Sequence, residues 1–255
     1  MIDTKKRDTL AAQSMYVVKS NELIQRSRYS LSLMEQKAVL FLISKIKPND
    51  EPNTEYLFDV KDFCRACNFY EDSGFYAKYV KDIMLSLADN KIVVDIDKGK
   101  TLITHWFSSA IIDNEANNIR IRFDYTITPY LFQLRSFYTQ YSLEYVLPMK
   151  SKYGVRLYEF LRSVKTLNYI QTYSIEELRL RLDCDKYPNF KDFRKYVLEP
   201  AISDINAYSD IEVNYECVKT GRKYTAITFT IKNCSGDEKN MERFINRRKV
   251  LGEIR

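Results

Sequence analysis

Two stretches of this 255-residue chain fall into register when the sequence is laid over itself with a shift of 117 residues. Tyr56 then meets Tyr173, and Lys78-Tyr79-Val80 meets Lys195-Tyr196-Val197. The other pairs in register are Phe58 with Ile175, Phe63 with Leu180 and Cys67 with Cys184. Such a period is too long for one solenoid unit and suits two copies of a small domain. The sequence therefore predicts two domains related by internal duplication.

The composition of the chain suits two small domains. Hydrophobic residues make up 45% of it, which is enough to build a core in each domain. Lys and Arg total 40 against 34 Asp and Glu, a net charge of +6, so any basic surface has to be local. The N-terminus lacks the apolar stretch of a signal peptide, and no later run has the length of a membrane span. We therefore expect a cytoplasmic protein.

The first half of the chain predicts a helix-turn-helix followed by a basic hairpin. The expected elements are a short strand at 17–21, a helix at 21–47, a strand at 56–58, helices at 60–67 and 75–88, and strands at 91–97, 101–113 and 119–124. Ser32 and Glu35 form a capping box inside the first helical pattern. Lys98-Gly99-Lys100 joins the first two strands of the hairpin region. This order is that of a winged helix.

The second half repeats the same order of elements. We expect a helix at 149–165, a strand at 173–175, a short helix ending near 182, a longer helix at 190–207, and strands at 211–218 and 224–232. Ser174 and Glu177 form a second capping box. Pro200 has no N–H to donate, so the longer helix should bend or restart there. Like the first wing tip, the second places a glycine, Gly221, between cations.

These patterns predict an α+β fold of tandem winged-helix domains. The expected divisions are a flexible leader at 1–16, a first winged-helix domain at 17–125, a second at 126–232 that starts with a linking helix at 127–134, and a basic C-terminal tail at 233–255. The tail carries four cations, Arg243, Arg247, Arg248 and Lys249. They are interpreted as a contact with DNA or a partner, or as an ordinary solvated tail.

The sequence lacks the residues that common enzyme chemistries need. It has one histidine, His105, whereas tyrosine nucleases of replication origins hold a metal on a histidine pair. None of the six glycines begins a phosphate-binding loop. Cys64 and Cys67 have the spacing of half a zinc site, but no second such pair exists, so buried reduced thiols are the favoured interpretation. We expect no catalytic residue, no metal and no cofactor.

Cations gather on three predicted elements of the second domain. On the long helix, Lys191 and Lys195 lie opposite the apolar side, with Arg194 at its edge. The other predicted contacts are Lys219, Arg222 and Lys223 on the wing, and Lys150, Ser151 and Lys152 at a helix start. A charged helix face is most often a solvated face. Three basic elements in one winged-helix domain nevertheless favour contact with double-stranded DNA.

The first domain carries fewer cations at the matching positions. Gly74 and Ala77 stand where the second domain has Lys191 and Arg194. The predicted phosphate contacts that remain are Lys78, Lys81, Lys98 and Lys100. We therefore expect the second domain to read bases, and the first to grip phosphate or to pair with another subunit.

Three segments carry a resemblance to a known family. They are VVKSNELIQRSRYSLSLMEQKAVLFLISKI, SLEYVLPMKSKYGVRLYEFLRSVKT and FRKYVLEPAISDINAYSDIEVNYECVKTGRKYTAITFTI, within 17–232. In these segments the chain resembles replication initiator proteins of iteron-bearing, theta-replicating plasmids. The resemblance implies two winged-helix domains, monomers bound to direct repeats at the origin, and dimers that repress or are inactive. It also implies that Lys150-Ser151-Lys152-Tyr153 touches phosphates and that Lys191, Arg194 and Lys195 face bases.

The leading hypothesis is a non-enzymatic origin-binding initiator. It would bind direct repeats, assist strand opening, recruit the host helicase, primase or initiator, and repress its own gene. One alternative is a winged-helix transcriptional repressor without a role in initiation. Another is a tyrosine nickase, which the twenty tyrosines suggest.

Overall fold

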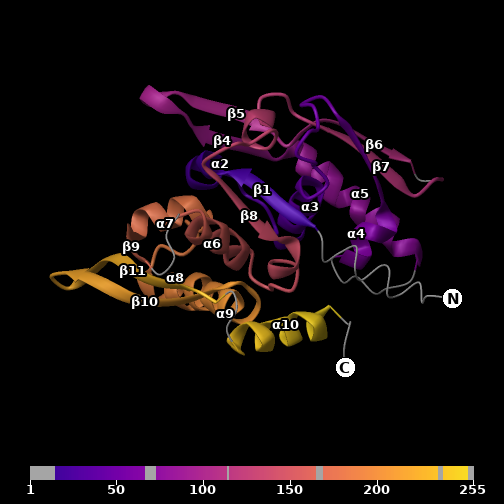
Figure 1. Ribbon diagram of the computed structural model, residues 1–255. Coiled ribbons are helices and arrows are strands. Elements are labelled where there is room, and N and C mark those ends of the chain that lie inside the picture. The colour runs from indigo at the N-terminus through magenta and orange to yellow at the C-terminus, as the bar shows by residue number, and fades with distance from the viewer. Residues whose placement is uncertain (1–14, 67–72, 114, 165–168, 235–237, 252–255) are drawn as a thin grey trace.

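The computed structural model describes residues 15–66, 73–113, 115–164, 169–234 and 238–251, which form helices and antiparallel sheets (Figure 1). The elements of the N-terminal half are β1 (Tyr16–Ser20), α2 (Asn21–Arg26), β2 (Ser27–Arg28), α3 (Leu33–Ile43), β3 (Glu55–Asp59), α4 (Val60–Ala66), α5 (Ser73–Asp89), β4 (Lys91–Asp95), β5 (Thr101–His105), β6 (Phe107–Asp113) and β7 (Asn118–Phe123). Those of the C-terminal half are β8 (Tyr138–Ser142), α6 (Lys152–Arg162), β9 (Tyr169–Ser174), α7 (Ile175–Leu182), α8 (Phe190–Phe193), α9 (Glu199–Tyr208), β10 (Ile211–Thr220), β11 (Lys223–Asn233) and α10 (Glu238–Val250).

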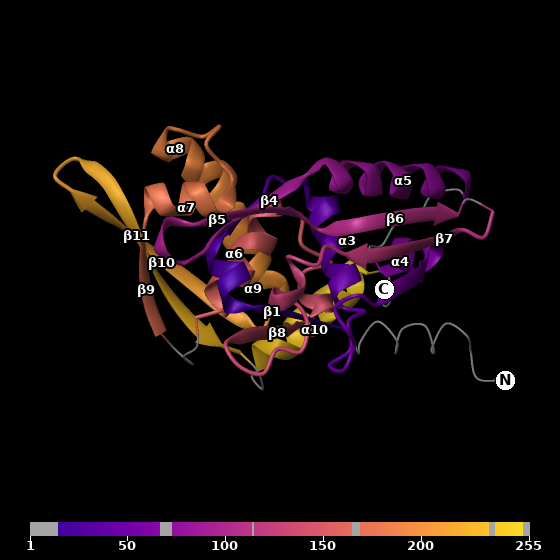
Figure 2. The ribbon, with the colours of Figure 1, turned by 90° about the horizontal axis from the view of Figure 1, so that it is seen from above.

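The second domain has the strand order of a winged helix. β9 precedes the helices and pairs with β11, which also pairs with β10, so the antiparallel sheet is ordered β10-β11-β9. Its inner face is aromatic: the Tyr173 ring lies 4.7 Å from that of Phe160 on α6 and 6.2 Å from that of Phe229. The β10–β11 hairpin is the wing, and its tip extends beyond the body of the domain (Figure 2). Gly221 has φ +62 at this tip, a conformation that favours glycine.

Apart from β1, which pairs with β8, the strands of the first domain form two sheets. One is ordered β2-β4-β5 and the other β3-β7-β6. The β4–β5 hairpin corresponds to the predicted wing. Beyond the fully buried Trp106 the chain continues into β6, which leaves the first sheet and pairs with β7. The strand that precedes the helix-turn-helix, β3, therefore pairs with β7 and not with the wing.

The expected fold class is confirmed, since both halves contain a helix, a strand, two further helices and a hairpin. The internal duplication stays a prediction. Some pairs that the shift brings together have equal burial, such as Tyr56 and Tyr173, which are 8% and 7% exposed. Others do not, because Phe63 is 2% exposed and Leu180 is 43% exposed.

A buried polar cluster lies where β1 and β8 pack against α6. β1 pairs with β8, and the Lys19 side chain of β1 reaches α6, where its Nζ lies 2.8 Å from Glu159 Oε1. Both side chains are 1% exposed. Tyr141 on β8 donates to the same carboxylate at 2.6 Å, and Arg156 on α6 donates to the Ser27 carbonyl at 2.7 Å. Charges this deeply buried need such partners, and these partners come from different elements.

The helix predicted at 21–47 is wrong as a single element. α2 ends at Arg26, and Ser27 and Arg28 are extended and pair with β4. A new helix, α3, begins after Ser32, whose Oγ accepts from the Glu35 N–H while Glu35 accepts from the Ser32 N–H. The capping box was predicted correctly. The pairing of Ser27 and Arg28 with β4 thus overrides the helical preference of this segment.

In place of the linking helix expected at 127–134, the chain forms a 3-10 turn, Thr128–Tyr130. Gln133 has φ +50, in the left-handed region, which ends any helical continuation. The chain then enters β8 and pairs with β1. Of the helices that the described residues form, none is long and apolar enough to cross a membrane.

Candidate nucleic-acid interface

The long helix of the second domain exposes the three cations that the sequence singled out. Phe193 on α8 is fully buried, as are Val197 and Ala201, while Lys191, Arg194 and Lys195 are exposed. Asn189 begins the helix by accepting the Lys191 N–H on its side chain at 2.8 Å. The helical periodicity therefore separated core from surface correctly. That these cations read bases stays a prediction.

Between α8 and α9 the helix widens into a π-helical turn, Arg194–Leu198. The Glu199 N–H donates to the Arg194 carbonyl, five residues back. Pro200 has no N–H for the Tyr196 carbonyl, which removes the normal α-helical bond at this point. The sequence predicted that the long helix bends or restarts at Pro200, and in the structure this interruption is the wide π-helical turn. Arg194 Nε also lies 2.8 Å from Glu199 Oε1, and this hydrogen bond raises the pKa of the guanidinium.

A carboxylate already occupies the backbone amides at the start of α6. Asp204 on α9 accepts the N–H groups of Lys150 and Ser151 at 2.8 and 2.7 Å. Burial is the largest influence on Asp204 and raises its pKa, although the two amide bonds act in the opposite direction. Ser151 accepts the Gly154 N–H as the helix cap. Backbone amides at a helix start often bind phosphate, but these two are paired within the protein.

The side chains at the start of α6 differ in accessibility. Lys150 is exposed, and Lys152 is half-buried with its Nζ 3.6 Å from Asp183 Oδ2. Tyr153 is only 6% exposed, so its hydroxyl does not lie on the surface. An open groove of about 430 Å³ runs from this helix start to the wide turn. It is lined by Lys150, Ser151, Lys152, Tyr153, Tyr196, Pro200, Ser203 and Asp204.

Aromatic stacking attaches the wing to α8, the start of the second helix of the helix-turn-helix, which by position is called the recognition helix. The ring of Tyr224 on β11 lies 4.2 Å from that of Phe190 on α8, at 20° between planes. Lys219 places its Nζ 4.6 Å from the Tyr224 ring centroid. Arg222 and Lys223 at the tip are exposed. The wing cations are thereby held beside the helix that carries Lys191.

In the first domain the predicted contacts are dispersed among acidic groups. Lys78 and Lys81 are exposed on α5, and Lys100 is exposed at the tip of the β4–β5 hairpin. Lys98 lies in the 3-10 turn Asp97–Gly99, and its side chain is outside the described part of the structure. Asp97 in the same turn binds Arg26 at 2.8 Å.

Two arginines of the C-terminal segment have a structural role that sequence reasoning missed. Arg243 and Arg247 are 5% and 4% exposed on α10. They donate to the carbonyls of Ser209 and Tyr208 at 3.2 and 2.9 Å, at the C-terminal end of α9. Cations are favoured there because the carbonyls at a helix end carry partial negative charge. The interpretation as a solvated tail is therefore wrong for these two arginines, and a contact of this segment with DNA or a partner stays a prediction.

Thiol and histidine chemistry has little support in the described residues. Burial raises the pKa of the Cys64 thiol to about 11 and that of Cys184 to about 12, which makes both poor nucleophiles. Cys67 lies outside the described residues. Within the described ranges no three His, Cys, Asp or Glu side chains are placed to hold a metal ion. His105 is exposed at the end of β5.

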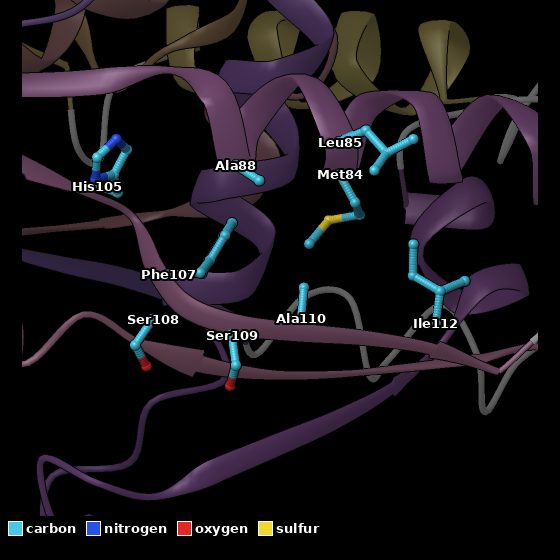
Figure 3. A pocket seen from close by; sticks show the side chains of 9 residues that line it. All are labelled: Met84, Leu85, Ala88, His105, Phe107, Ser108, Ser109, Ala110 and Ile112. Carbon is cyan, nitrogen blue, oxygen red and sulfur yellow. The ribbon is translucent and has the colours of Figure 1, made fainter.

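A second groove, of about 360 Å³, lies in the first domain between α5 and β6 (Figure 3). Its walls are mainly apolar: Met84, Leu85 and Ala88 come from the helix, and Phe107, Ala110 and Ile112 from the strand. His105, Ser108 and Ser109 lie along its rim (Figure 3). None of the described residues that line this groove is a Lys or Arg, which a phosphate contact would need.

These features define a tandem winged-helix protein with basic side chains at the start of α6, on α8 with its wide turn, and on the β10–β11 wing. Residues 16–162 match the family model "Initiator Replication protein, WH1", and residues 174–231 match "Initiator Rep protein, WH2". The chain belongs to this family of replication initiators, and the resemblance read from its sequence is confirmed. The first match includes α6, which packs on both α3 and α9. The domain boundary expected at 125 and 126 stays a prediction.

Two known proteins resemble the chain over most of its length. A "Replication initiation protein" of Escherichia coli is 28% identical over 233 residues, which cover 86% of this chain and 70% of that protein. The crystal structure of Pi initiator protein in complex with iteron DNA superposes with a TM-score of 0.69 at 20% identity. That match covers 87% of this chain and 98% of the other, and it shows a shared fold.

Proposed function

We propose that this chain is a sequence-specific, double-stranded DNA-binding replication initiator that acts in the cytoplasm. It would bind direct repeats at a plasmid origin, mainly through its second domain. The observation that carries this proposal is that three basic elements lie next to one another: the wing, the recognition helix and the start of α6. The Phe190–Tyr224 stack joins the wing to the recognition helix, and the groove beside Tyr196 joins that helix to the start of α6. α8 and the wing also project from the same end of the molecule (Figure 2).

The chemistry of these elements suits duplex DNA. Exposed Lys and Arg side chains supply the phosphate contacts that dominate affinity, and they hydrogen-bond to guanine in the major groove. The predicted base-reading residues are Lys191, Arg194 and Lys195. Family membership supports the same function, and a structural relative is titled as a complex with iteron DNA. For Tyr153, a phosphate contact would require its buried hydroxyl to become accessible.

A footprint on the DNA flanking the gene tests this proposal. Near physiological salt, with random competitor DNA present, we expect regular protection of tandem direct repeats that are spaced by about 10.5 bp or its multiples. A single protected inverted repeat over the promoter would favour the repressor. Replication supplied in trans to a plasmid that carries only the repeats separates an initiator from a repressor, because repression of a promoter does not start replication.

We propose that the chain acts without catalysis and recruits a host helicase, primase or initiator. The high pKa of the buried thiols supports the first part. Incubation with supercoiled origin DNA and Mg²⁺ should leave that DNA unrelaxed, whereas relaxation would show a nickase. Loading of purified host helicase onto origin plasmid should require this protein, and loading in its absence would contradict recruitment.

We also propose that the protein associates with a second copy of itself through the first domain. β6 lies at the edge of the β3-β7-β6 sheet, beside the apolar groove. Ile111 on this strand is 52% exposed, and Leu85 on α5 is 53% exposed. An edge strand can pair antiparallel with its own copy, which closes a two-fold dimer.

The mass of the particle in solution tests this association. Ile111→Lys should convert dimers to monomers in light scattering, because it places a charge in the interface. Leu57→Lys is the matched control, since Leu57 is 63% exposed on β3, at the opposite edge of the same sheet. Dissociation by Leu57→Lys alone would show that the wrong edge was chosen.

A further inference from the structure

The wide turn in the recognition helix brings a tyrosine to the surface beside the predicted base-reading cations. Arg194, Lys195 and Tyr196 are consecutive, and all three are exposed. In a regular α-helix three successive residues spread over about 200° of the helix surface, so one of them usually faces the core. Here Val197 and Leu198 take the buried positions, both at 0% exposure. The turn thus keeps the core filled while Tyr196 remains 47% exposed.

The Tyr196 ring is held in place by its neighbours. It stacks on Tyr187, with ring centroids 5.5 Å apart and planes 22° apart. The Nζ of Lys195 lies 5.0 Å from its centroid. Tyr187 in turn meets the buried Tyr153 edge-on at 6.4 Å. Because the ring is already ordered, a ligand that contacts it loses little side-chain entropy.

The position of the ring lies between two kinds of predicted DNA contact. On one side are Lys191 and Lys195, which are predicted to face bases. On the other, Tyr196 lines the groove that also contains Lys150 and Lys152, which are predicted to face phosphates. A large aromatic ring at this junction supplies what cations do not, an apolar surface.

We propose that the Tyr196 ring makes an apolar contact with carbon atoms of DNA and helps to determine which sites are bound. The carbon surface is a thymine 5-methyl group or a deoxyribose. This inference rests on the proposed DNA binding by the second domain. An uncharged contact releases no counterions, so it adds affinity without adding salt dependence. That property distinguishes Tyr196 from every cation of the surface.

Binding of purified protein to its repeat DNA across a salt series tests the proposal. Tyr196→Ala should weaken binding about tenfold, with an unchanged slope of log affinity against log salt. Tyr196→Phe should bind within about twofold of the wild type, since the ring makes the contact. Tyr16→Ala is the matched control, because Tyr16 is 48% exposed on β1 and does not line the groove beside Tyr196. It should bind as the wild type does.

Replacing thymine by uracil, one position at a time, separates the two carbon sources. If a methyl group is the partner, one replacement weakens the wild type severalfold and leaves Tyr196→Ala unaffected. If deoxyribose is the partner, Tyr196→Ala weakens binding, and each uracil replacement changes the affinity of the wild type and of Tyr196→Ala by the same factor. Either result supports an apolar contact.

Three outcomes would overturn the inference. They are wild-type affinity in Tyr196→Ala, a loss in Tyr196→Phe as large as in Tyr196→Ala, and a change in salt slope in Tyr196→Ala. Equal thermal unfolding midpoints for the variants exclude a folding defect. A wild-type protein that fails to prefer repeats over random DNA would instead remove the proposed function. The two failures are therefore distinguishable.

Discussion

The long helix of the helix-turn-helix differs between the two domains. In the first domain α5 runs unbroken from Ser73 to Asp89, whereas in the second a π-helical turn separates α8 from α9. On its exposed side α5 follows Lys78 and Lys81 with Asp82, Leu85 and Ala88. The second domain presents Lys191, Arg194, Lys195 and Tyr196.

The two surfaces therefore suit different partners although the order of elements is shared. A helix that mixes cations with carboxylates and apolar side chains, beside an apolar groove, fits a protein surface better than phosphate. A helix with cations and an aromatic ring, beside a basic wing, fits DNA. A shared fold therefore does not imply a shared function. The side chains on each surface decide which partner it suits.

The largest expected difference between the domains is in specific DNA affinity. Lys191→Ala with Lys195→Ala should cost about 4 kcal/mol on repeat DNA, roughly a thousandfold, since each base contact is worth about 1–3 kcal/mol. Lys78→Ala with Lys81→Ala removes two cations from the equivalent helix and should cost at most about tenfold, equally on repeat and random DNA. Competition binding at fixed salt measures both. Equal losses of affinity for repeat DNA from the two pairs of substitutions would show that the two helices do not differ in base reading.

The next largest effect concerns the buried ion pair between β1 and α6. Lys19→Met leaves Glu159 buried without its ammonium partner and should lower the free energy of unfolding by about 3–5 kcal/mol. Arg26→Met breaks a surface pair with Asp97, whose side chains are 43% and 81% exposed, and should cost less than about 1 kcal/mol. Urea unfolding compares them. Similar losses would show that the buried pair stabilises the protein no more than the exposed one.

A smaller effect is expected at the C-terminal end of α9, where arginines of α10 donate hydrogen bonds to the last carbonyls. Arg247→Ala removes the hydrogen bond to the Tyr208 carbonyl and the contact with Glu144, 3.6 Å away, and should cost about 2 kcal/mol of stability. Lys249→Ala changes an exposed cation of the same helix and should leave the thermal midpoint unchanged. A loss in Lys249→Ala as large as in Arg247→Ala would contradict the capping role.

The smallest effect separates the two wings. Lys219→Ala and Lys223→Ala should each reduce the slope of log affinity against log salt by about 1, as expected for one phosphate contact. Lys100→Ala on the first hairpin should reduce it less, because Asp97 carries negative charge in the same tip. A larger reduction of the slope by Lys100→Ala than by either substitution on the second wing would show that the first hairpin makes the stronger phosphate contact.

Several features of the fold were predictable because their causes are local. The Ser32 capping box needs only residues within one turn, and it formed as expected. Pro200 predicted an interruption of the long helix because a missing N–H acts on the carbonyl four residues back. The glycines of both wing tips, Gly99 and Gly221, have φ +74 and +62. The exposed cations of the long helix followed from its periodicity.

Other features depend on residues that are distant along the chain. Asp204 covers the amides of Lys150 and Ser151, although more than fifty residues separate them. Arg243 and Arg247 looked like part of a basic tail until the end of α9 was placed beside them. In each case a charged side chain is indistinguishable in sequence from a solvated one.

The sequence by itself determined the order of helix-turn-helix and wing in each half, the paired winged-helix architecture, the family and the exposed cations of the long helix. Each of these follows from short-range periodicity, from capping and turn residues, or from extended sequence motifs. The tertiary structure alone decided that β3 pairs with β7, that Lys19 and Glu159 meet in the interior, and that Tyr196 lies between two sets of cations. Strand partners and buried pairs join segments far apart in the chain, so the packing of the whole domain selects them and no local pattern does.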